Sequence, residues 1–336
     1  RDLPLRFAAG TGPNQPVDIL SHIVSVADLP AAIAAGLRAC TALTEQAQTS
    51  EATSAPSDFD PRTGIVTFSD GTQIRTTLLV DASGAHSIWR QRAGLSCMLH
   101  DYECAALTAE IALAAPHGQV ARQVFFSNGP LALLPLPKPD RAALIWSLPA
   151  RKAQALAACD ENLFNGELNA AARGVFGQMH LVGALAQQPL TAQIAEAFIG
   201  PRLALVGEAA HVIHPLAGQG MNLTLRDIGA LVDTLKNARR LGLECGDATM
   251  LENYAGLRRA DAFAGAFGTH ALAEIFSGPG PARMLAAAGM RGVGYIADNW
   301  PKLKNAFRRQ ADQGLGPLSG LFASAPPNAP DAKKGR

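Results

Sequence analysis

The segment from Arg202 to Asn222, RLALVGEAAHVIHPLAGQGMN, restricts the fold more than any other part of the chain. It begins with five largely apolar residues, which suit a central strand that is buried on both faces. Gly207 then allows a tight turn, and the amphipathic run LTLRDIGALVDTL after Gly220 has the pattern of a helix. A buried strand, a glycine turn and a helix in this order indicate an open α/β sheet, where ligands bind at the carboxyl ends of strands.

The polar and glycine residues of this segment suit a cofactor that has a ring system and a sugar-like chain. Glu208 follows the strand directly and can accept hydrogen bonds from the hydroxyls of a ribose or ribityl chain. Gly218 and Gly220 have no side chains, so a ring can approach the backbone, and the free N–H groups of the helix start attract negative charge. The alternative is purely structural, with an ordinary loop through Pro215 and a glycine-capped helix. The ordered combination favours a flavin site.

Composition and charge exclude several other classes of function. The 336 residues include 48% hydrophobic residues and have a net charge of +1, so the chain lacks the basic field of a nucleic-acid-binding protein. Five cysteines without CxxC spacing are typical of reduced thiols in a cytoplasmic protein. No apolar run reaches the roughly 18 residues that a membrane span requires.

The histidines do not predict a metal site. His211 and His214 are three residues apart, but no carboxylate or cysteine completes a ligand set with them. We therefore expect no metal, and we interpret His214 as lining the cofactor pocket. The other histidines are scattered, and we interpret them as ordinary polar residues: His22, His86, His100, His117, His180 and His270.

The rest of the chain predicts a second lobe inserted into the first. In residues 64–83, strand-like runs flank Asp70-Gly71, a strong hairpin signal, and the second run extends to Val80. Residues 102–148 contain longer strand-like runs, which predict a mainly antiparallel sheet. We also expect helices at 27–40, 161–177 and 250–276, strands at 17–25 and 41–50, and a disordered tail at 326–336.

Four segments together resemble a known family. LALVGEAAHVIHPLAGQGMNLTLRD is similar to the second FAD-binding motif of the flavin-dependent aromatic hydroxylases, which have the p-hydroxybenzoate hydroxylase fold. The resemblance is greatest to the branch that hydroxylates polyprenylated phenols in ubiquinone biosynthesis. The segments GPLALLPLP (129–137), LLVDASGAHSIWRQRAG (78–94) and YAGLRRADA (254–262) match the same branch.

The resemblance implies roles for individual residues of the 207–227 segment. Glu208, next to Gly207, would hold the ribityl or ribose hydroxyls, a role that aspartate fills more often in the family. Asp227 would be a structural anchor on the following helix. His214 would belong to the flavin-facing loop, and the residues along the isoalloxazine ring would be Pro215, Gly218, Gln219, Gly220, Met221 and Asn222.

The segment LLVDASGAHSIWRQRAG (78–94) occupies the place of the family's middle motif, and it departs from the family pattern there. Ser83-Gly84 stands where an Asp-Gly pair is expected, and Asp81 lies two residues earlier. Either Asp81 substitutes in part, or the contact of this segment with pyrophosphate and NAD(P)H is weakened. Ser87 and Arg90 keep their expected positions, and Arg90 is either a phosphate clamp or a surface arginine at a helix start.

The implied fold class is α/β (α+β overall), a Rossmann-like FAD-binding domain with an inserted antiparallel substrate domain and C-terminal helices. The expected boundaries are 1–98 and 191–250 for the FAD-binding domain, 99–190 for the substrate domain, and 251–325 for the helices. The family begins with a strand–GxGxxG–helix unit of roughly 30 residues or more, which this sequence lacks. We expect a fragment or a truncated gene product, and weak FAD binding by this chain alone.

The resemblance also implies the chemistry. NAD(P)H would reduce FAD, O₂ would add as a flavin C4a-hydroperoxide, and the phenolic ring would take the distal oxygen, with no side chain assigned as acid or base. The alternatives are a hydroxylase of another aromatic compound and a non-catalytic binding or scaffold protein. We expect a cytoplasmic protein without a nucleic-acid partner, with peripheral contact to the inner face of the membrane or to a ubiquinone-biosynthesis complex. The run KLKNAFRRQ (302–310) would make that membrane contact or be a solvated helix face.

Overall fold

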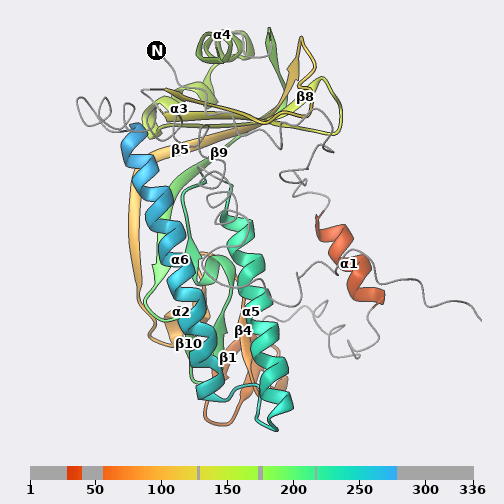
Figure 1. Ribbon diagram of the computed structural model, residues 1–336, viewed down its shortest axis with the longest axis vertical. Helices are drawn as coiled ribbons and strands as arrows, with labels where there is room; N and C mark the ends of the chain where they lie inside the picture. The colour runs from red at the N-terminus through yellow and green to blue at the C-terminus, as the bar shows by residue number, and fades with distance from the viewer. Residues whose placement is uncertain (1–28, 40–55, 127–128, 173–176, 216–217, 278–336) are drawn as a thin grey trace, which may run out of the picture.

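The computed structural model describes residues 29–39, 56–126, 129–172, 177–215 and 218–277. The strands expected at 17–25 and 41–50, the basic run 302–310 and the tail 326–336 lie outside these residues. The helix expected at 27–40 is confirmed as α1 (Leu29–Ala39). The remaining elements form an upper and a lower lobe that share two long strands (Figure 1).

The upper lobe is a six-stranded antiparallel sheet with the order β12-β9-β5-β8-β7-β6. Its core consists of alternating apolar residues such as Leu107 and Ile111, both completely buried. Helices α3 (Ala150–Ala158) and α4 (Glu161–Ala172) cover the face that points away from the lower lobe (Figure 1). The strands are β5 (Cys97–Leu113), β6 (Arg122–Phe126), β7 (Gly129–Pro135), β8 (Arg141–Pro149), β9 (Met179–Ala195) and β12 (His211–Val212).

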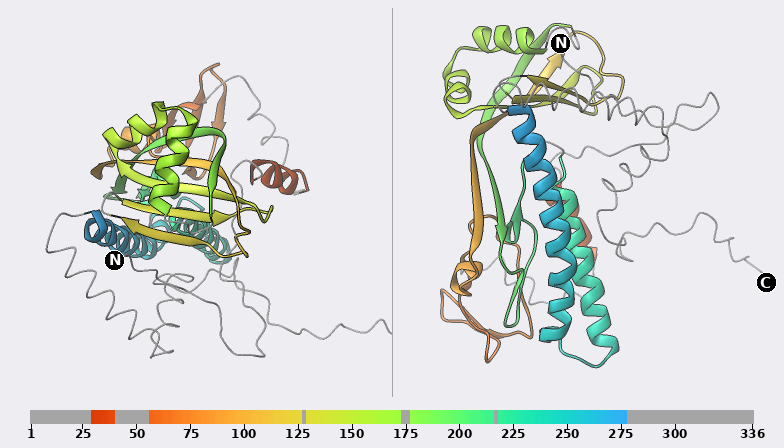
Figure 2. Two further views of the ribbon diagram at one scale, coloured as in Figure 1. Left: turned by 90° about the horizontal axis from the view of Figure 1, so that it is seen from above. Right: turned by 60° about the vertical axis from the view of Figure 1, so that its left-hand side comes forward.

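The antiparallel sheet predicted for 102–148 is confirmed, but β9 was not predicted. Its centre, GALAQQPL, mixes glycine, glutamine and proline, so it lacks the alternation that identifies a strand. Its 17 residues form a strand because they pair along almost the whole of β5. Both strands run from the upper sheet down beside the lower lobe (Figure 2).

The lower lobe contains the predicted α/β unit. Strand β11 (Leu203–Leu205) pairs in parallel with β4 (Leu79–Asp81) and antiparallel with β10 (Ile199–Gly200). All three β11 residues are buried, as expected for a central strand. The helices α5 (Gly220–Arg240) and α6 (Ala248–Ser277) pack side by side against this unit (Figures 1 and 2). The α/β fold with an antiparallel sheet and C-terminal helices is therefore confirmed.

A third, small sheet contains the hairpin predicted around Asp70-Gly71. Strands β1 (Pro56–Asp60), β2 (Ile65–Phe68) and β3 (Gln73–Arg75) form it in this order. The prediction that the second arm continues to Val80 was wrong, because β3 ends at Arg75 and Val80 lies in β4 of the parallel unit. The change of sheet places Asp81 beside the end of β11.

Candidate cofactor site

The turn that carries Glu208 depends on glycine at position 207. Gly207 has a φ of +63°, and a Cβ atom there would lie 3.0 Å from Cγ2 and Oγ1 of Thr224 on α5. The following short 3₁₀ turn, Gly207–Ala209, buries Ala209 but leaves Glu208 exposed. The carboxylate therefore points out of the core, and it lies at the carboxyl end of the central strand, where the sequence placed it.

The middle motif meets this turn from the neighbouring strand. A Cβ atom built on Gly84, whose φ is +91°, would lie 4.0 Å from Oε2 of Glu208. Because β4 and β11 are parallel, the residues that follow them reach the same edge of the sheet. The structure thus brings together Gly84 and Glu208, which are distant in the sequence.

Asp81 organises the middle motif internally. It is buried, and its Oδ1 accepts hydrogen bonds from the backbone N of Ser83 at 3.0 Å and from Ser83 Oγ at 2.6 Å. Its Oδ2 accepts a hydrogen bond from Ser87 Oγ. Ser87 Oγ in turn accepts from the backbone N of Arg90 at 2.9 Å, as the N-cap of α2 (Ile88–Arg92). Asp81 therefore faces its own loop, so the idea that its carboxylate substitutes for the expected aspartate gains no support.

Arg90 connects the two motif loops. Its Nη1 donates to the carbonyl oxygen of Ala209 at 2.6 Å and its Nη2 donates to that of Ala85 at 2.7 Å. Only 5% of the residue is exposed, so the interpretation as a surface arginine is wrong. The role of a phosphate clamp stays a prediction, while the observed contacts hold the turn with Glu208 beside the turn with Gly84.

The start of α5 offers open backbone N–H groups. The helix begins at Gly220, its N-cap Gln219 makes no side-chain cap hydrogen bond, and its first turn has no acidic residue. A Cβ atom on Gly218 or Gly220 would meet no atom of the described residues within 4 Å. Met221 and Asn222 are exposed beside them. Since no side chain of the described residues approaches these glycines, the positive end of the α5 dipole suits an electron-rich ring.

Asp227 anchors α5 to the turn below the site. It is completely buried, and its Oδ2 accepts hydrogen bonds from the backbone N of Gly207 at 2.9 Å and from Nε2 of His211 at 2.7 Å. Its Oδ1 accepts from Nε of Arg258 at 2.7 Å. The expectation that Asp227 is a structural anchor is confirmed.

The YAGLRRADA segment (254–262) of α6 also holds the central strand and Asp227 in place. The Tyr254 hydroxyl donates to the carbonyl oxygen of Leu205 at 2.7 Å, and its pKa is raised well above the usual value, mainly by burial. Arg258 also donates to Asp261 at 2.7 Å. Burial opposes the charge of Arg258, but the carboxylates of Asp227 and Asp261 raise its pKa, so the buried charges are paired.

His214, which directly precedes Pro215 in the segment before α5, is a buried neutral ring. Burial, and then the charge of His270, lower its pKa from 6.5 to about 4. His100 and His270, interpreted from the sequence as ordinary polar residues, gather with His214 around Tyr102. Sequence reasoning missed this cluster because its members come from three separate segments. Within the described residues, no three His, Cys, Asp or Glu side chains are placed to hold a metal ion.

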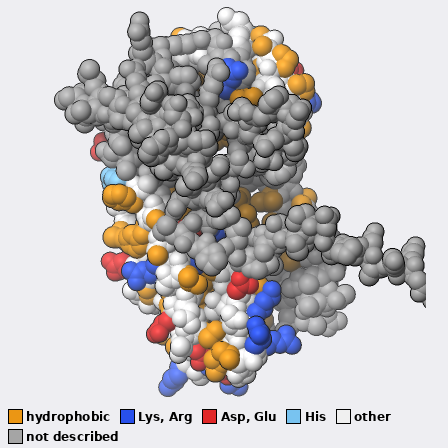
Figure 3. Space-filling model, viewed as in Figure 1, with side chains coloured by type: hydrophobic (Ala, Val, Ile, Leu, Met, Phe, Trp, Pro, Cys, Tyr) orange, Lys and Arg blue, Asp and Glu red, His pale blue; other side chains and the backbone are white. Residues whose placement is uncertain are grey.

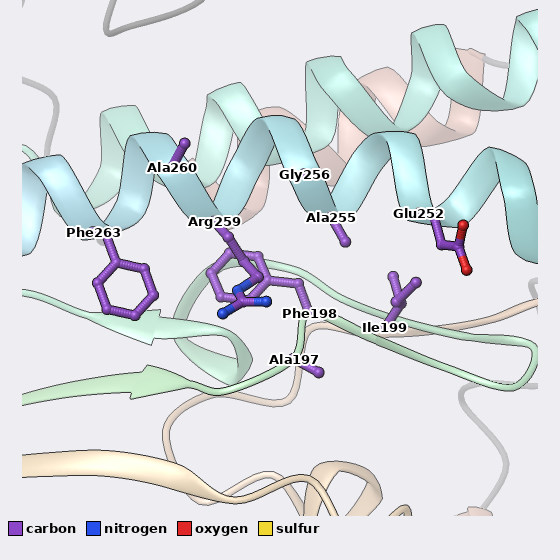
Figure 4. Close-up of a pocket in the computed structure, with 9 residues that line it drawn as sticks. All are labelled: Ala197, Phe198, Ile199, Glu252, Ala255, Gly256, Arg259, Ala260 and Phe263. Atoms are coloured by element: carbon purple, nitrogen blue, oxygen red, sulfur yellow. The ribbon is translucent and has the colours of Figure 1, made fainter.

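A shallow groove lies along α6 but contains none of the residues above. It has a volume of about 540 Å³, and the residues that line it include Phe198, Arg259 and Phe263 (Figure 4). On the described part of the face in Figure 3, hydrophobic side chains alternate with basic and acidic ones. No helix in the described residues is long and apolar enough to cross a membrane.

The parallel strand pair and the residues at its carboxyl ends define an α/β protein that binds a cofactor bearing a nucleotide or sugar chain. Residues 22–263 match the family described as FAD binding domain, and this match covers most of the chain. The chain belongs to this FAD-binding domain family, whose cofactor is FAD. Its open α5 N-terminus and exposed Glu208 fit an electron-rich ring and a hydroxyl-bearing chain.

Individual relatives support the resemblance to the ubiquinone branch, which is confirmed. Ubiquinone hydroxylase UbiL of Rhodospirillum rubrum is 36% identical over 245 residues, covering 73% of this chain and 56% of UbiL. The 3-demethoxyubiquinol 3-hydroxylase of Escherichia coli is 38% identical over 197 residues, covering 57% of this chain and 49% of that enzyme. The structure of Pseudomonas aeruginosa PqsL with 2-aminobenzoylacetate has a TM-score of 0.55 at 26% identity, covering 70% of this chain and 65% of PqsL.

The chain spans about half the length of the curated relatives it matches. The regions that do match include the strand–turn–helix segment and the antiparallel sheet, within residues 22–263.

Proposed function

We propose that the protein is an FAD-dependent monooxygenase that hydroxylates the aromatic ring of a polyprenylated phenol in ubiquinone biosynthesis, with NAD(P)H and O₂ as co-substrates. The observation that carries this proposal is the meeting of Glu208, Gly84 and the open start of α5 at one edge of the sheet. The names of the relatives, ubiquinone hydroxylase and 3-demethoxyubiquinol 3-hydroxylase, supply the substrate class.

Each part of this edge has a role in the proposal. Glu208, presented by the Gly207 turn, binds the ribityl or ribose hydroxyls, while Ser83 and Gly84 lie alongside the rest of the cofactor. Bound FAD supplies the transfer of electrons from NAD(P)H and the activation of O₂. The α5 N-terminus stabilises negative charge on the ring, and these residues line it: Pro215, Gly218, Gln219, Gly220, Met221 and Asn222.

His214 and Pro215 form the proposed flavin-facing loop, and we assign no side chain as acid or base. The aromatic substrate would lie between this loop and the sheet of β7 and β8. The buried neutral ring of His214 keeps charge away from the ring-binding side of the loop. Such a site binds, orients and excludes water around the reacting rings.

The domain boundaries form part of the proposal. The FAD-binding domain comprises 1–98 and 191–250, the substrate domain 99–190, and the C-terminal helices 251–325. The two hydrophobic cores support the separation of the substrate domain, because the upper core is built around 105–179 and the lower core draws mainly on 194–266. The lower core includes Leu251 and Tyr254, so the C-terminal helices share it with the FAD-binding domain.

A cytoplasmic location with peripheral contact to the inner face of the membrane would bring the protein to a polyprenylated substrate. A ubiquinone-biosynthesis complex would serve the same purpose. Flotation of the purified protein with anionic vesicles tests the membrane contact, and co-purification with other enzymes of the pathway tests the complex.

Two alternative functions are also compared in the experiment described below. A hydroxylase of another aromatic compound would use the same site with a different substrate. A non-catalytic binding or scaffold protein is favoured by one observation, namely that Ser83 stands where the resembled family has aspartate while Asp81 is committed to its own loop.

The deciding experiment is FAD titration of the purified protein, followed by NAD(P)H oxidation with and without a prenylated phenol. We expect saturable binding with a flavin absorbance band, and Glu208→Gln should weaken it about tenfold. Glu161→Gln, an exposed glutamate at the start of α4, serves as the matched control and should bind as the native protein does. A colourless protein that takes up no FAD would contradict the proposal and favour the scaffold role.

A further inference from the structure

A cluster of aromatic rings extends from His214 of the proposed cofactor loop, and the proposed function gives no role to the other rings of this cluster. Tyr102 lies at its centre. The ring centroids of His100 and His214 lie 4.6 Å and 4.7 Å from that of Tyr102, both edge-on, and the ring of His270 lies 5.7 Å away. The Tyr102 hydroxyl is 3.3 Å from Nδ1 of His270 on α6. The cluster thus connects β5, the loop before α5, and α6.

Tyr102 reaches these rings because β5 is irregular at this point. Asp101 pairs with Thr191 of β9 and Cys104 pairs with Leu190, so Tyr102 and Glu103 have no residues opposite them. Glu103 has a φ of 52°, and its backbone N donates to Oδ1 of Asp101 at 2.8 Å. A glutamate whose backbone adopts the left-handed conformation has an energetic cost. Bulges of this kind change the direction of side chains next to functional sites.

The segment that Tyr102 contacts is already held firmly on its N-terminal side. His211 pairs with Ile194 of β9, and its ring bonds to Asp227. His214, three residues later, is buried against the Tyr102 ring and directly precedes Pro215. Tyr102 therefore contacts the segment where it leaves the strand and turns toward the start of α5.

We propose that Tyr102, oriented by its hydrogen bond with His270, is a positioning residue for the His214–Pro215 segment, and through it for the ring of bound FAD. This inference rests on the proposed function, which places the cofactor ring along that segment. His214 is neutral at physiological pH, since its pKa is about 4, so Tyr102 holds it by ring packing and not by charge.

Hydrogen exchange of the FAD-free protein tests the inference without any cofactor. Tyr102→Leu removes the ring and the hydroxyl, and Tyr102→Phe removes only the hydroxyl. We expect the amides of Val212, Ile213 and His214 to exchange about two- to tenfold faster in Tyr102→Leu, with a smaller increase in Tyr102→Phe.

The matched control is His180→Asn, which changes an exposed histidine of β9 in the upper sheet and should leave this exchange unchanged. If Tyr102→Leu does not fold, then Tyr102→Phe and His270→Gln decide, since each keeps the bulk of its side chain. Native exchange rates at these amides in folded Tyr102 and His270 variants would overturn the inference.

Flavin absorbance provides a second readout, which a merely structural role would not change. In Tyr102→Phe loaded with FAD we expect a shifted flavin band and a raised KM for the phenol, while His180→Asn matches the native protein. An unshifted band in Tyr102→Phe would contradict the positioning role. If no variant and no native protein binds FAD, the proposed function fails, and the exchange measurement still decides whether Tyr102 positions the segment.

Discussion

The Nε atom of Arg258 lies 2.7 Å from Oδ1 of Asp227, in a pair where the carboxylate is completely buried. The other oxygen of Asp227 binds the backbone of Gly207 and the ring of His211. One buried carboxylate thus ties α6, α5 and the turn that presents Glu208 into a single unit. Loss of either charged partner is therefore expected to affect both stability and the site.

Replacing Arg258 tests this arrangement. In Arg258→Met the Asp227 carboxylate stays buried without its cation, so we expect the free energy of unfolding to fall by roughly 3–5 kcal/mol. Arg259→Met is the control, because Arg259 is the exposed neighbour on the same helix. This substitution should lower the free energy of unfolding much less than Arg258→Met does. Urea unfolding of both variants measures the difference, and equal losses would contradict the pairing.

Two glycine-to-alanine substitutions should change the stability of the protein in opposite directions. Gly207→Ala places a methyl group 3.0 Å from Thr224 at a φ of +63°, so we expect a loss of about 1–3 kcal/mol. Gly256→Ala adds a methyl group to α6 where nothing lies within 4 Å, and should stabilise the protein by up to about 1 kcal/mol. Thermal unfolding compares the two, and a neutral Gly207→Ala would show that the turn is not under this constraint.

Gly220→Ala separates folding from cofactor binding. Within the part of the chain that the structure describes, its Cβ atom would meet no atom within 4 Å, so the variant should fold as the native protein does. If the flavin ring lies against this backbone, the added methyl group should lower the affinity for FAD by about tenfold or more. FAD titration measures the effect, with Gly256→Ala as the control, and unchanged affinity would place the ring elsewhere.

His214 should make stability depend on pH. Burial, and then His270, lower its pKa from 6.5 to about 4 in the folded protein, so on acidification the unfolded chain binds this proton first. Stability should therefore fall as the pH falls from about 6.5 to about 4 and level off below that, with a loss of at most roughly 3 kcal/mol. Unfolding of the native protein and of His214→Phe at about pH 7 and about pH 4.5 isolates this contribution. The same pH dependence in both proteins would contradict it.

The strand–turn–helix unit was predictable because its signals are local. Apolar continuity marked β11, the glycines marked the turns, and helical periodicity marked α5. The position of Glu208 directly after the strand followed from the same local pattern. The antiparallel sheet was predictable for the same reason wherever its strands alternate.

The connections between segments were not predictable from local pattern. Nothing around Arg90 indicates that its guanidinium reaches the carbonyl of Ala209, and nothing around Tyr102 indicates a bulge or a ring cluster. The strand β9 forms by pairing with β5 along a sequence that has weak strand character. Such features depend on partners distant in the chain, which a single sequence does not specify.

The buried carboxylate of Asp227 also sets an order for the assembly of the nascent polypeptide. Gly207 and His211 leave the ribosome well before Arg258 and Asp261, so until α6 emerges Asp227 lacks the Arg258 guanidinium that lies 2.7 Å from it in the folded protein. Domains form as their chain becomes available. The turn that presents Glu208 is therefore expected to be among the last parts of the lower lobe to mature, only after α6 has been synthesised.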